Sequence, residues 1–181
     1  MKTVVFITGT NAAGKTTLAK ELIRRYGGVA RMEGRTSVCA DGRIALAGKF
    51  SGVKHGGVDG LNETRCLADM AREAFRTHEV FICEGSYMNT FGINLTNAMF
   101  TAPGHLVVSL YAPLTEIHNR LRKRTVGGGI KLTIANKQQL SLASARKWAE
   151  IGVPVLTFNT LETPVEAVAD AVQAKIESLC M

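Results

Sequence analysis

The sequence has little cysteine, and its cysteines do not form a metal-binding pattern. Cys39, Cys66, Cys83 and Cys180 lie far apart in a chain of 181 residues. No two of them form a C-x-x-C pair, and no histidine stands near them at the spacing of a metal ligand. These absences argue against a zinc site and a disulfide framework. They indicate four reduced thiols in a reducing compartment.

Long apolar runs are also absent. No segment is long enough to cross a bilayer, and the short apolar run after Lys2 leads directly into a glycine-rich loop, unlike a secretory signal. Internal repeats and low-complexity segments are missing too. The composition, 46% apolar and 20% charged, is that of a globular protein. We therefore expect one soluble cytoplasmic domain over residues 1–181, long enough to bury a full core.

Acidic residues are scarce relative to basic ones. The chain has 22 Lys and Arg against 15 Asp and Glu, which gives a net charge of +7. No Asp or Glu occurs between Glu116 and Glu150. This balance favours a polyanionic partner such as nucleic acid. A phosphate-binding site with a basic lid would also need several cations, so both explanations stay open.

The most informative motif is the stretch from Gly9 to Thr17, which matches the phosphate-binding pattern G-x-x-x-x-G-K-[ST]. A β-branched, apolar run at residues 3–7 predicts a buried strand before it, and apolar residues at helical spacing from Leu18 to Tyr26 predict a helix after it. This order of strand, loop and helix predicts a site for ATP and Mg²⁺. Its cofactor-binding residues would be Asn11, Ala12, Ala13, Gly14, Lys15, Thr16 and Thr17.

Each residue type in the motif has a chemical task. The glycines allow the backbone N–H groups to point at a phosphate, and the start of the helix adds its dipole. Lys15 would bind the β- and γ-phosphates, and the hydroxyl of Thr16 would be a Mg²⁺ ligand.

Residues 34–60 form a glycine-rich region that we expect to be an insertion on the acceptor side of the site. Two short β-prone segments flank Asp41-Gly42, which is a strong hairpin signal, so Asp41 is predicted to be a turn residue. Asp59 lies at the end of this region and is a candidate catalytic base.

A second informative position is Glu84, which ends the apolar run Val80–Cys83. Ligands of parallel α/β sheets bind beyond the carboxyl ends of the strands, where a carboxylate can reach Mg²⁺ or accept a proton. Glu84 is therefore our first candidate for both roles, ahead of Asp59 and, more distantly, Glu33. Gly85 would leave room for the substrate.

Tyr87 and Phe91 follow this strand. They could stack on a base, although such aromatics are also common in cores, and both explanations stay open.

Basic residues and glycines follow a helix that begins at Leu114, and they predict a lid at about residues 120–134. Helical spacing puts Arg120 and Arg124 on one face, where they would contact the transferring phosphoryl group. Further on, Trp148 is expected to anchor the core, and Asn159, after a last strand at residues 153–158, to lie near the nucleotide. The pattern also predicts a weak strand at 29–33, a strand at 106–111, and helices at 61–77, 138–151 and 164–179.

These features occur in an order that resembles the P-loop kinase family, which includes nucleoside, nucleotide and small-metabolite kinases. The resemblance implies a three-layer α/β/α P-loop NTPase fold with a five-stranded parallel sheet of order 2-3-1-4-5 and an arginine-bearing lid. It also implies that Lys15 and Thr16 hold ATP and Mg²⁺. Glu84 would be the catalytic acid at the strand end, and Arg120 and Arg124 would be the lid arginines. Deoxynucleoside kinases have Glu-Arg-Ser where this chain has Glu84-Gly85-Ser86.

The segments at residues 54–60 and 83–86 look more like bacteriophage kinases that phosphorylate the hydroxymethyl group of 5-hydroxymethyluracil in DNA. That resemblance implies DNA as the partner and, for a phage protein, the host cytoplasm as its location. A small-molecule nucleoside or nucleotide kinase is the alternative. A third possibility is an ATP-gated binding protein with no phosphoryl acceptor.

Overall fold

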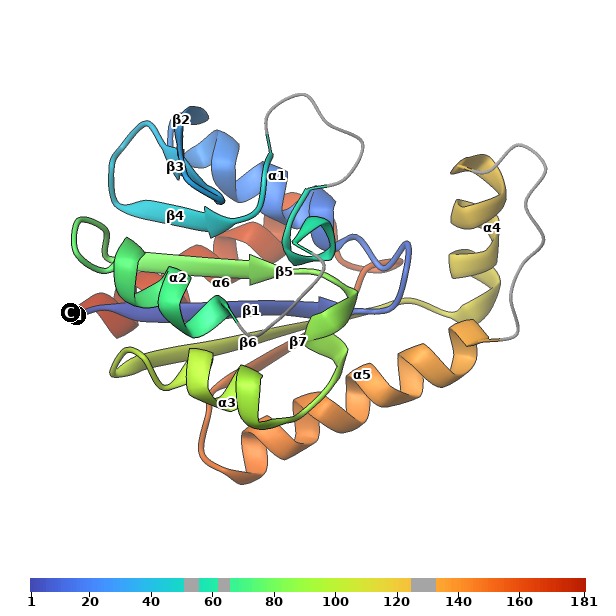
Figure 1. The fold of residues 1–181 in the computed structure, drawn as a ribbon. Helices are drawn as coiled ribbons and strands as arrows, with labels where there is room; N and C mark the ends of the chain where they lie inside the picture. Colours follow the sequence, from blue (N-terminus) through green and yellow to red (C-terminus); the bar gives the residue numbers. More distant parts are fainter. Residues whose placement is uncertain (51–55, 62–65, 125–132) are drawn as a thin grey trace.

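The computed structural model describes residues 1–50, 56–61, 66–124 and 133–181, and in them one mixed sheet forms the centre of the molecule (Figure 1). Its strands run in the order β2-β3-β4-β5-β1-β6-β7. The strands are β1 (Thr3–Gly9), β2 (Val29–Glu33), β3 (Thr36–Cys39), β4 (Ile44–Ala47), β5 (Val80–Glu84), β6 (Gly104–Tyr111) and β7 (Val155–Asn159).

The prediction of a five-stranded, fully parallel sheet is wrong, because the sheet has seven strands of mixed direction. Strands β4, β5, β1, β6 and β7 pair in parallel, whereas β2 and β3 add an antiparallel edge. Two tight turns, one at Gly34 with a φ of +57° and one at Asp41-Gly42, fold this segment back on itself twice. Two segments of the region 34–60, β3 and β4, thus belong to the sheet. The carboxylate of Asp41 accepts a hydrogen bond from the Arg43 N–H at 3.0 Å, which confirms the turn role.

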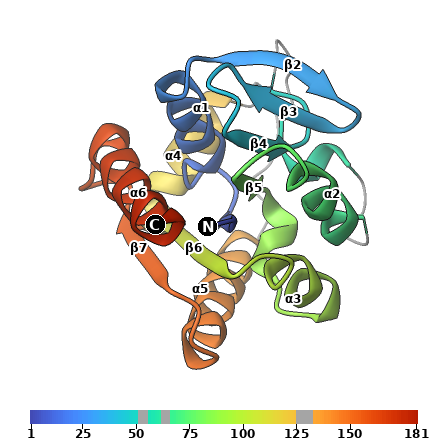
Figure 2. The same ribbon diagram turned by 90° about the vertical axis from the view of Figure 1, so that its left-hand side faces the viewer.

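Helices cover both faces of the sheet, which confirms the predicted three layers (Figure 2). Helices α1 (Lys15–Arg25) and α6 (Val165–Cys180) lie on one face. Helices α2 (Leu67–Ala74), α3 (Ile93–Met99) and α5 (Thr133–Glu150) lie on the other. Helix α4 (Leu114–Arg124) stands beyond the carboxyl end of β1 (Figure 1).

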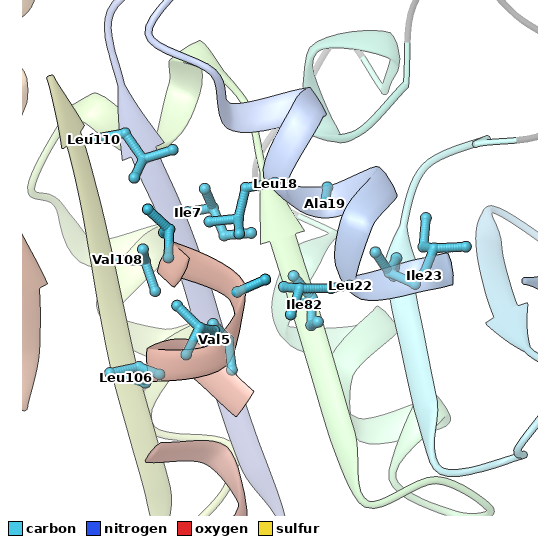
Figure 3. Packing of buried hydrophobic residues seen from close by; sticks show 14 of the residues in the cluster. Val5, Ile7, Leu18, Ala19, Leu22, Ile23, Ile82, Leu106, Val108 and Leu110 are labelled. Atoms are coloured by element: carbon cyan, nitrogen blue, oxygen red, sulfur yellow. The ribbon is translucent and has the colours of Figure 1, made fainter. Parts of the chain in front are cut away.

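Strand β1 holds the two cores together, since all seven of its residues are buried. Val5 and Ile7 pack toward Leu18 and Leu22 of α1 (Figure 3). The alternate residues face the other core, where the rings of Phe6 and Trp148 meet edge to face at 5.8 Å. Trp148 is therefore the core anchor that the sequence predicted. This packing fixes the point at which the loop after β1 begins.

The four cysteines are free, as expected from their spacing. Burial raises the pKa of the Cys39 thiol to about 12, and it also raises the pKa of the Cys83 thiol. Both cysteines therefore behave as apolar core residues. Among the described helices, none combines the length and the apolar character needed to cross a membrane.

Candidate active site

The loop after β1 has the geometry of a phosphate-binding loop. It leads from β1 into α1, in the order that the sequence predicted. Gly14 caps α1 with a φ of +100°, a conformation that favours glycine. A Cβ at Gly9 would meet the carbonyl oxygen of Leu110 at 2.5 Å, so the backbones of β1 and β6 approach each other too closely for a side chain. Both glycines of the motif are thus required by the local structure.

Lys15 lies buried at the start of α1, and its side chain reaches back over the loop. Its ammonium group donates to the carbonyl oxygens of Gly9 at 2.9 Å and Thr10 at 3.1 Å. These contacts hold a cation at the position where the loop's N–H groups would receive phosphates.

Glu84 lies beside this loop because β1 and β5 are parallel neighbours, with Ile7 opposite Glu84. The hydroxyl of Thr16 donates to its Oε1 at 3.1 Å, and the residue is 2% exposed. Burial raises the pKa of the Glu84 carboxyl to about 7, although Lys15 and the Thr16 hydroxyl oppose this shift. A carboxyl with such a pKa can exchange a proton near neutral pH.

Asp59 approaches the same place from η1 (Val58–Gly60). Its Oδ1 accepts a hydrogen bond at 2.6 Å from the N–H of Ser86, in η2 (Ser86–Asn89). A Cβ at Gly85 would lie 2.7 Å from this oxygen, so Gly85 makes room for Asp59 and not for a substrate. The negative charge of Asp59 also contributes to the raised pKa of Glu84.

The candidate base Glu33 lies elsewhere. Its carboxylate pairs with Arg31 and with the ring of the buried His78, at the β2 edge of the sheet. It does not line the cavities at the phosphate loop.

A first cavity, of about 290 Å³, is lined by the carboxylates of Glu84 and Asp59 and by the phosphate loop. Lys15, Thr16, Glu84 and Asp59 all line this cavity. The other lining residues are Asn11, Ala12, Gly14, Thr17, Gly56, Ser86 and Leu121.

A second cavity, of about 250 Å³, borders the same loop at Ala12, Gly14 and Thr17. Its walls come from the start of α1, from α4 and from the segment after β7. They are formed by Ala12, Gly14, Thr17, Leu18, Leu110, Arg120, Thr160, Thr163, Val165 and Val168. The two cavities share the loop, so one nucleotide could span them with its phosphates in the first and its base in the second.

Arg120 lines the second cavity and not the first. Its guanidinium donates to the carbonyl oxygens of Ala12 at 3.3 Å and Thr160 at 2.9 Å, and its Nε donates to Glu116 at 2.7 Å. It therefore joins the phosphate loop to the segment after β7. A contact between Arg120 and the transferring phosphoryl group stays a prediction.

The rest of the predicted lid lies mostly outside the described residues. Residues 125–132 and the side chain of Arg124 are not described, so the role of Arg124 stays a prediction.

Replacing Arg120 with alanine is expected to raise the KM for ATP about tenfold, with a smaller effect on kcat. The reason is that the variant loses the hydrogen bonds that join the phosphate loop to the segment after β7 at the second cavity, while Lys15 and Glu84 keep their contacts. Steady-state kinetics at varied ATP measure this split. Arg122→Ala, on the same helix, serves as the control, and a loss confined to kcat would place Arg120 at the phosphoryl group instead.

Asn159 ends β7, but it does not line either cavity. Its side-chain oxygen accepts a hydrogen bond from the N–H of Leu161 at 3.1 Å and so shapes the turn. Thr160 and Thr163, which follow it, line the second cavity. A direct role of Asn159 in nucleotide binding stays a prediction.

Asn89 is a site residue that the sequence did not reveal. It is buried, and its Oδ1 accepts hydrogen bonds from the Thr8 hydroxyl at 2.8 Å and from the Gly9 N–H at 2.9 Å. It thereby holds the entry of the phosphate loop against η2, which begins two residues after Glu84. A lone asparagine in an apolar segment gives no pattern that could have predicted this contact.

The oxygen donors fit Mg²⁺. Mg²⁺ prefers oxygen ligands, and it usually takes only one or two from the protein and the rest from phosphates and water. The Thr16 hydroxyl and the Glu84 carboxylate are such a pair. Among the described residues no group of three or more His, Cys, Asp or Glu could hold a metal by itself.

Two solved structures share the fold along nearly the whole chain. The YorR protein of Bacillus subtilis, in complex with phosphorylated GDP, is 18% identical, with a TM-score of 0.60 over 96% of this chain and 95% of its own. An unliganded sugar kinase from Janibacter sp. HTCC2649 is 15% identical, with a TM-score of 0.56 over 98% and 95%. No family model and no curated protein sequence matches the chain. The chain therefore has the α/β fold of these two proteins.

Proposed function

We propose that the protein is an ATP-dependent phosphotransferase that moves the γ-phosphoryl group to a hydroxyl. One observation carries the proposal. A phosphate loop with its lysine in place shares a cavity with a buried carboxylate, Glu84, whose pKa is about 7. A site that only held nucleotide would not need a proton acceptor beside the loop.

In this proposal the nucleotide base and ribose occupy the cavity beside Arg120, and the phosphates lie on the N–H groups of residues 11–16. Mg²⁺, held by Thr16 and Glu84 together with the phosphates, would neutralise phosphate charge. Lys15 stabilises the charge on the phosphoryl oxygens as it moves. The acceptor enters the larger cavity from the side of Asp59 and Ser86.

The acceptor's hydroxyl oxygen forms the new bond to the γ-phosphorus, while the bond between this phosphorus and the β–γ bridging oxygen breaks. ADP leaves with that oxygen. The hydroxyl proton passes to the carboxylate of Glu84. Asp59, which lines the same cavity and is exposed, is the alternative base.

A small nucleoside or nucleotide is the acceptor that the structure supports best. The cavity of about 290 Å³ is near the lower end of the range for small-molecule sites. The YorR protein, of the same fold, was found with a phosphorylated nucleotide.

The second candidate acceptor is the 5-hydroxymethyl group of 5-hydroxymethyluracil in DNA. The net charge of +7 favours it, because phosphate backbones attract basic proteins. The target base would have to leave its stack to reach Glu84, which costs a few kcal/mol.

Transfer of labelled γ-phosphate tests these proposals together. The reactions contain no acceptor, free nucleosides and nucleotides including the 5-hydroxymethyl-dU series, DNA with 5-hydroxymethyluracil, or unmodified DNA. We expect label on a free nucleoside or nucleotide. Label on the modified DNA alone would favour the second candidate. If no acceptor raises turnover above basal ATP hydrolysis, an ATP-gated binding protein without acceptor becomes the better description.

A further inference from the structure

The positive charge of the protein is concentrated in one part of the chain. Residues 117–149 contain eight Lys and Arg and no Asp or Glu. The other residues hold the remaining 14 basic and all 15 acidic side chains, so their net charge is −1. Most of the excess positive charge thus lies in α4, α5 and the segment between them, since residues 114–150 hold eight Lys and Arg against Glu116 and Glu150.

Many of the arginines elsewhere are neutralised by neighbouring carboxylates. Most surface arginines of the rest of the fold form ion pairs, namely Arg24, Arg25, Arg31, Arg43, Arg72 and Arg76. On α5, by contrast, Lys137, Arg146 and Lys147 form no ion pair with any carboxylate in the described ranges. Their charge is available to an external anion.

One of these cations, Lys147, lies beside an exposed ring, that of Phe91. Lys137, Leu140, Ser144 and Lys147 follow one another at helical spacing along one stripe of α5. Contacts on this stripe dock it against the segment after β5. The Ser144 hydroxyl donates to the carbonyl oxygen of Thr90 at 3.1 Å, and the ammonium of Lys147 lies 5.9 Å from the centre of the Phe91 ring.

We call this surface the basic aromatic face and define it by Lys137, Leu140, Lys147, Tyr87 and Phe91. Leu140 is 58% exposed, Tyr87 44% and Phe91 37%. Phe91 packs edge to face on Trp148 and is therefore held in a fixed orientation. Figure 1 shows α5 running along the sheet on the side of α3, from the end near α4.

The face leads toward the larger cavity. Tyr87 follows Ser86, which lines that cavity together with Glu84. The hydroxyls of Ser141 on α5 and Thr8 at the phosphate loop lie 3.0 Å apart, so the helix is fixed next to the site. A ligand lying along α5 would therefore have one end beside Tyr87, which is next in sequence to the cavity-lining Ser86.

We propose that the basic aromatic face binds a single-stranded polynucleotide, with its phosphates on the lysines and its bases against Tyr87 and Phe91. Unpaired cations beside exposed aromatic rings are the combination by which proteins hold single strands. A duplex would hide its base faces from these rings, and an acidic protein would need no rings. The inference goes beyond phosphoryl transfer, because binding here requires neither ATP nor Glu84.

Fluorescence anisotropy of a labelled 12-nucleotide oligothymidylate, measured without ATP from 50 to 300 mM NaCl, tests this proposal. The double variant Lys137→Gln, Lys147→Gln is expected to bind at least tenfold more weakly at 100 mM salt. Its slope of log K against log salt should fall in magnitude by about 1.4, since each phosphate contact on a single strand contributes about 0.7. Tyr87→Ala should weaken binding about fivefold or more without changing the slope.

The matched control is Lys20→Gln, Lys175→Gln, which removes the same charge from α1 and α6 on the opposite face of the sheet. We expect it to bind as the unmodified protein does. Equal losses in both double variants, or no binding by the unmodified protein, would overturn the proposal. So would equal binding of heparin or anionic vesicles combined with no effect of Tyr87→Ala, since the face would then attract any polyanion. Circular dichroism melts show whether each variant is folded. If the double variant Lys137→Gln, Lys147→Gln is unfolded, the single variant Lys147→Gln is used in its place.

The result is independent of the proposed function. A protein that phosphorylates a free nucleotide and binds no oligonucleotide would refute this inference alone. A protein that binds oligonucleotide through this face and phosphorylates no acceptor would refute the phosphotransferase proposal alone.

Discussion

Replacement of Lys15 with alanine is expected to lower kcat for phosphoryl transfer at least ~10²–10³-fold, the usual cost of removing one group that stabilises transition-state charge. Lys15 is the cation that the loop holds in place, through the carbonyl oxygens of Gly9 and Thr10. Its loss also removes the charge that lowers the pKa of Glu84, so that pKa should rise further. The small activity that remains should therefore need a higher pH than that of the unmodified protein.

The fold should survive this substitution. Alanine is the best helix former, and Lys15 is the first residue of α1. Thermal melts monitor stability, and a labelled-phosphate assay monitors transfer. Lys20→Ala, on the exposed side of the same helix, is the control and should keep full activity. Full activity in the Lys15 variant would contradict the assignment of the phosphate loop.

The parts of the site that the sequence revealed are those with a local pattern. The phosphate loop, strand β5 with Glu84 at its end, and the Asp41-Gly42 turn each depend on neighbours within a few residues. Strand pairing is different, because the residues of β2 do not by themselves indicate which strand it will pair with. The sequence predicted a weak strand there but could not show that it closes the edge of the sheet.

Contacts between distant residues were missed for a related reason. The sequence predicted that Gly85 leaves room for a substrate. In the structure this room is taken by a carboxylate oxygen of Asp59, a residue distant in the sequence. Arg120 has the spacing of a lid arginine, but its direction is set by Thr160 and Ala12. Helical periodicity predicts which side chains share a face and not which partner that face meets.

Glu84→Gln is expected to lower kcat ~10²–10⁴-fold, the range for loss of a general base, while the affinity for ATP measured without Mg²⁺ changes little. Glutamine keeps the size of the side chain and can still accept the hydrogen bond from Thr16, but it cannot take a proton. Steady-state kinetics and ATP titration separate the two effects. Glu79→Gln, an exposed acid just before the amino end of the same strand, is the matched control. If Asp59→Asn shows the large loss in kcat and Glu84→Gln does not, Asp59 is the base.

The pH dependence of activity follows from the same carboxyl. In the free protein Glu84 becomes ionised as the pH rises through about 7, so kcat/KM should rise with pH and level off above that value. Asp59 helps to raise this pKa. If Glu84 is the base, Asp59→Asn should therefore move the rising limb to lower pH and leave the plateau nearly unchanged.

The contribution of Glu84 to the free energy of unfolding should fall as the pH rises, whereas activity should increase. The pKa of Glu84 rises from 4.5 to about 7 on folding, so the folded protein holds this proton more tightly than the unfolded chain does. Its contribution is fully present below pH 4.5 and is lost as the pH rises through 7, a difference of about 3 kcal/mol. At pH 8, glutamine avoids the buried charge, so Glu84→Gln should raise the free energy of unfolding of the ligand-free protein by up to that amount. The gain should vanish near pH 4, and urea unfolding at the two pH values measures it. A variant that is less stable than the unmodified protein at pH 8 would show that the ionised carboxylate is stabilised in the fold, and a raised pKa would then no longer explain its role as a base.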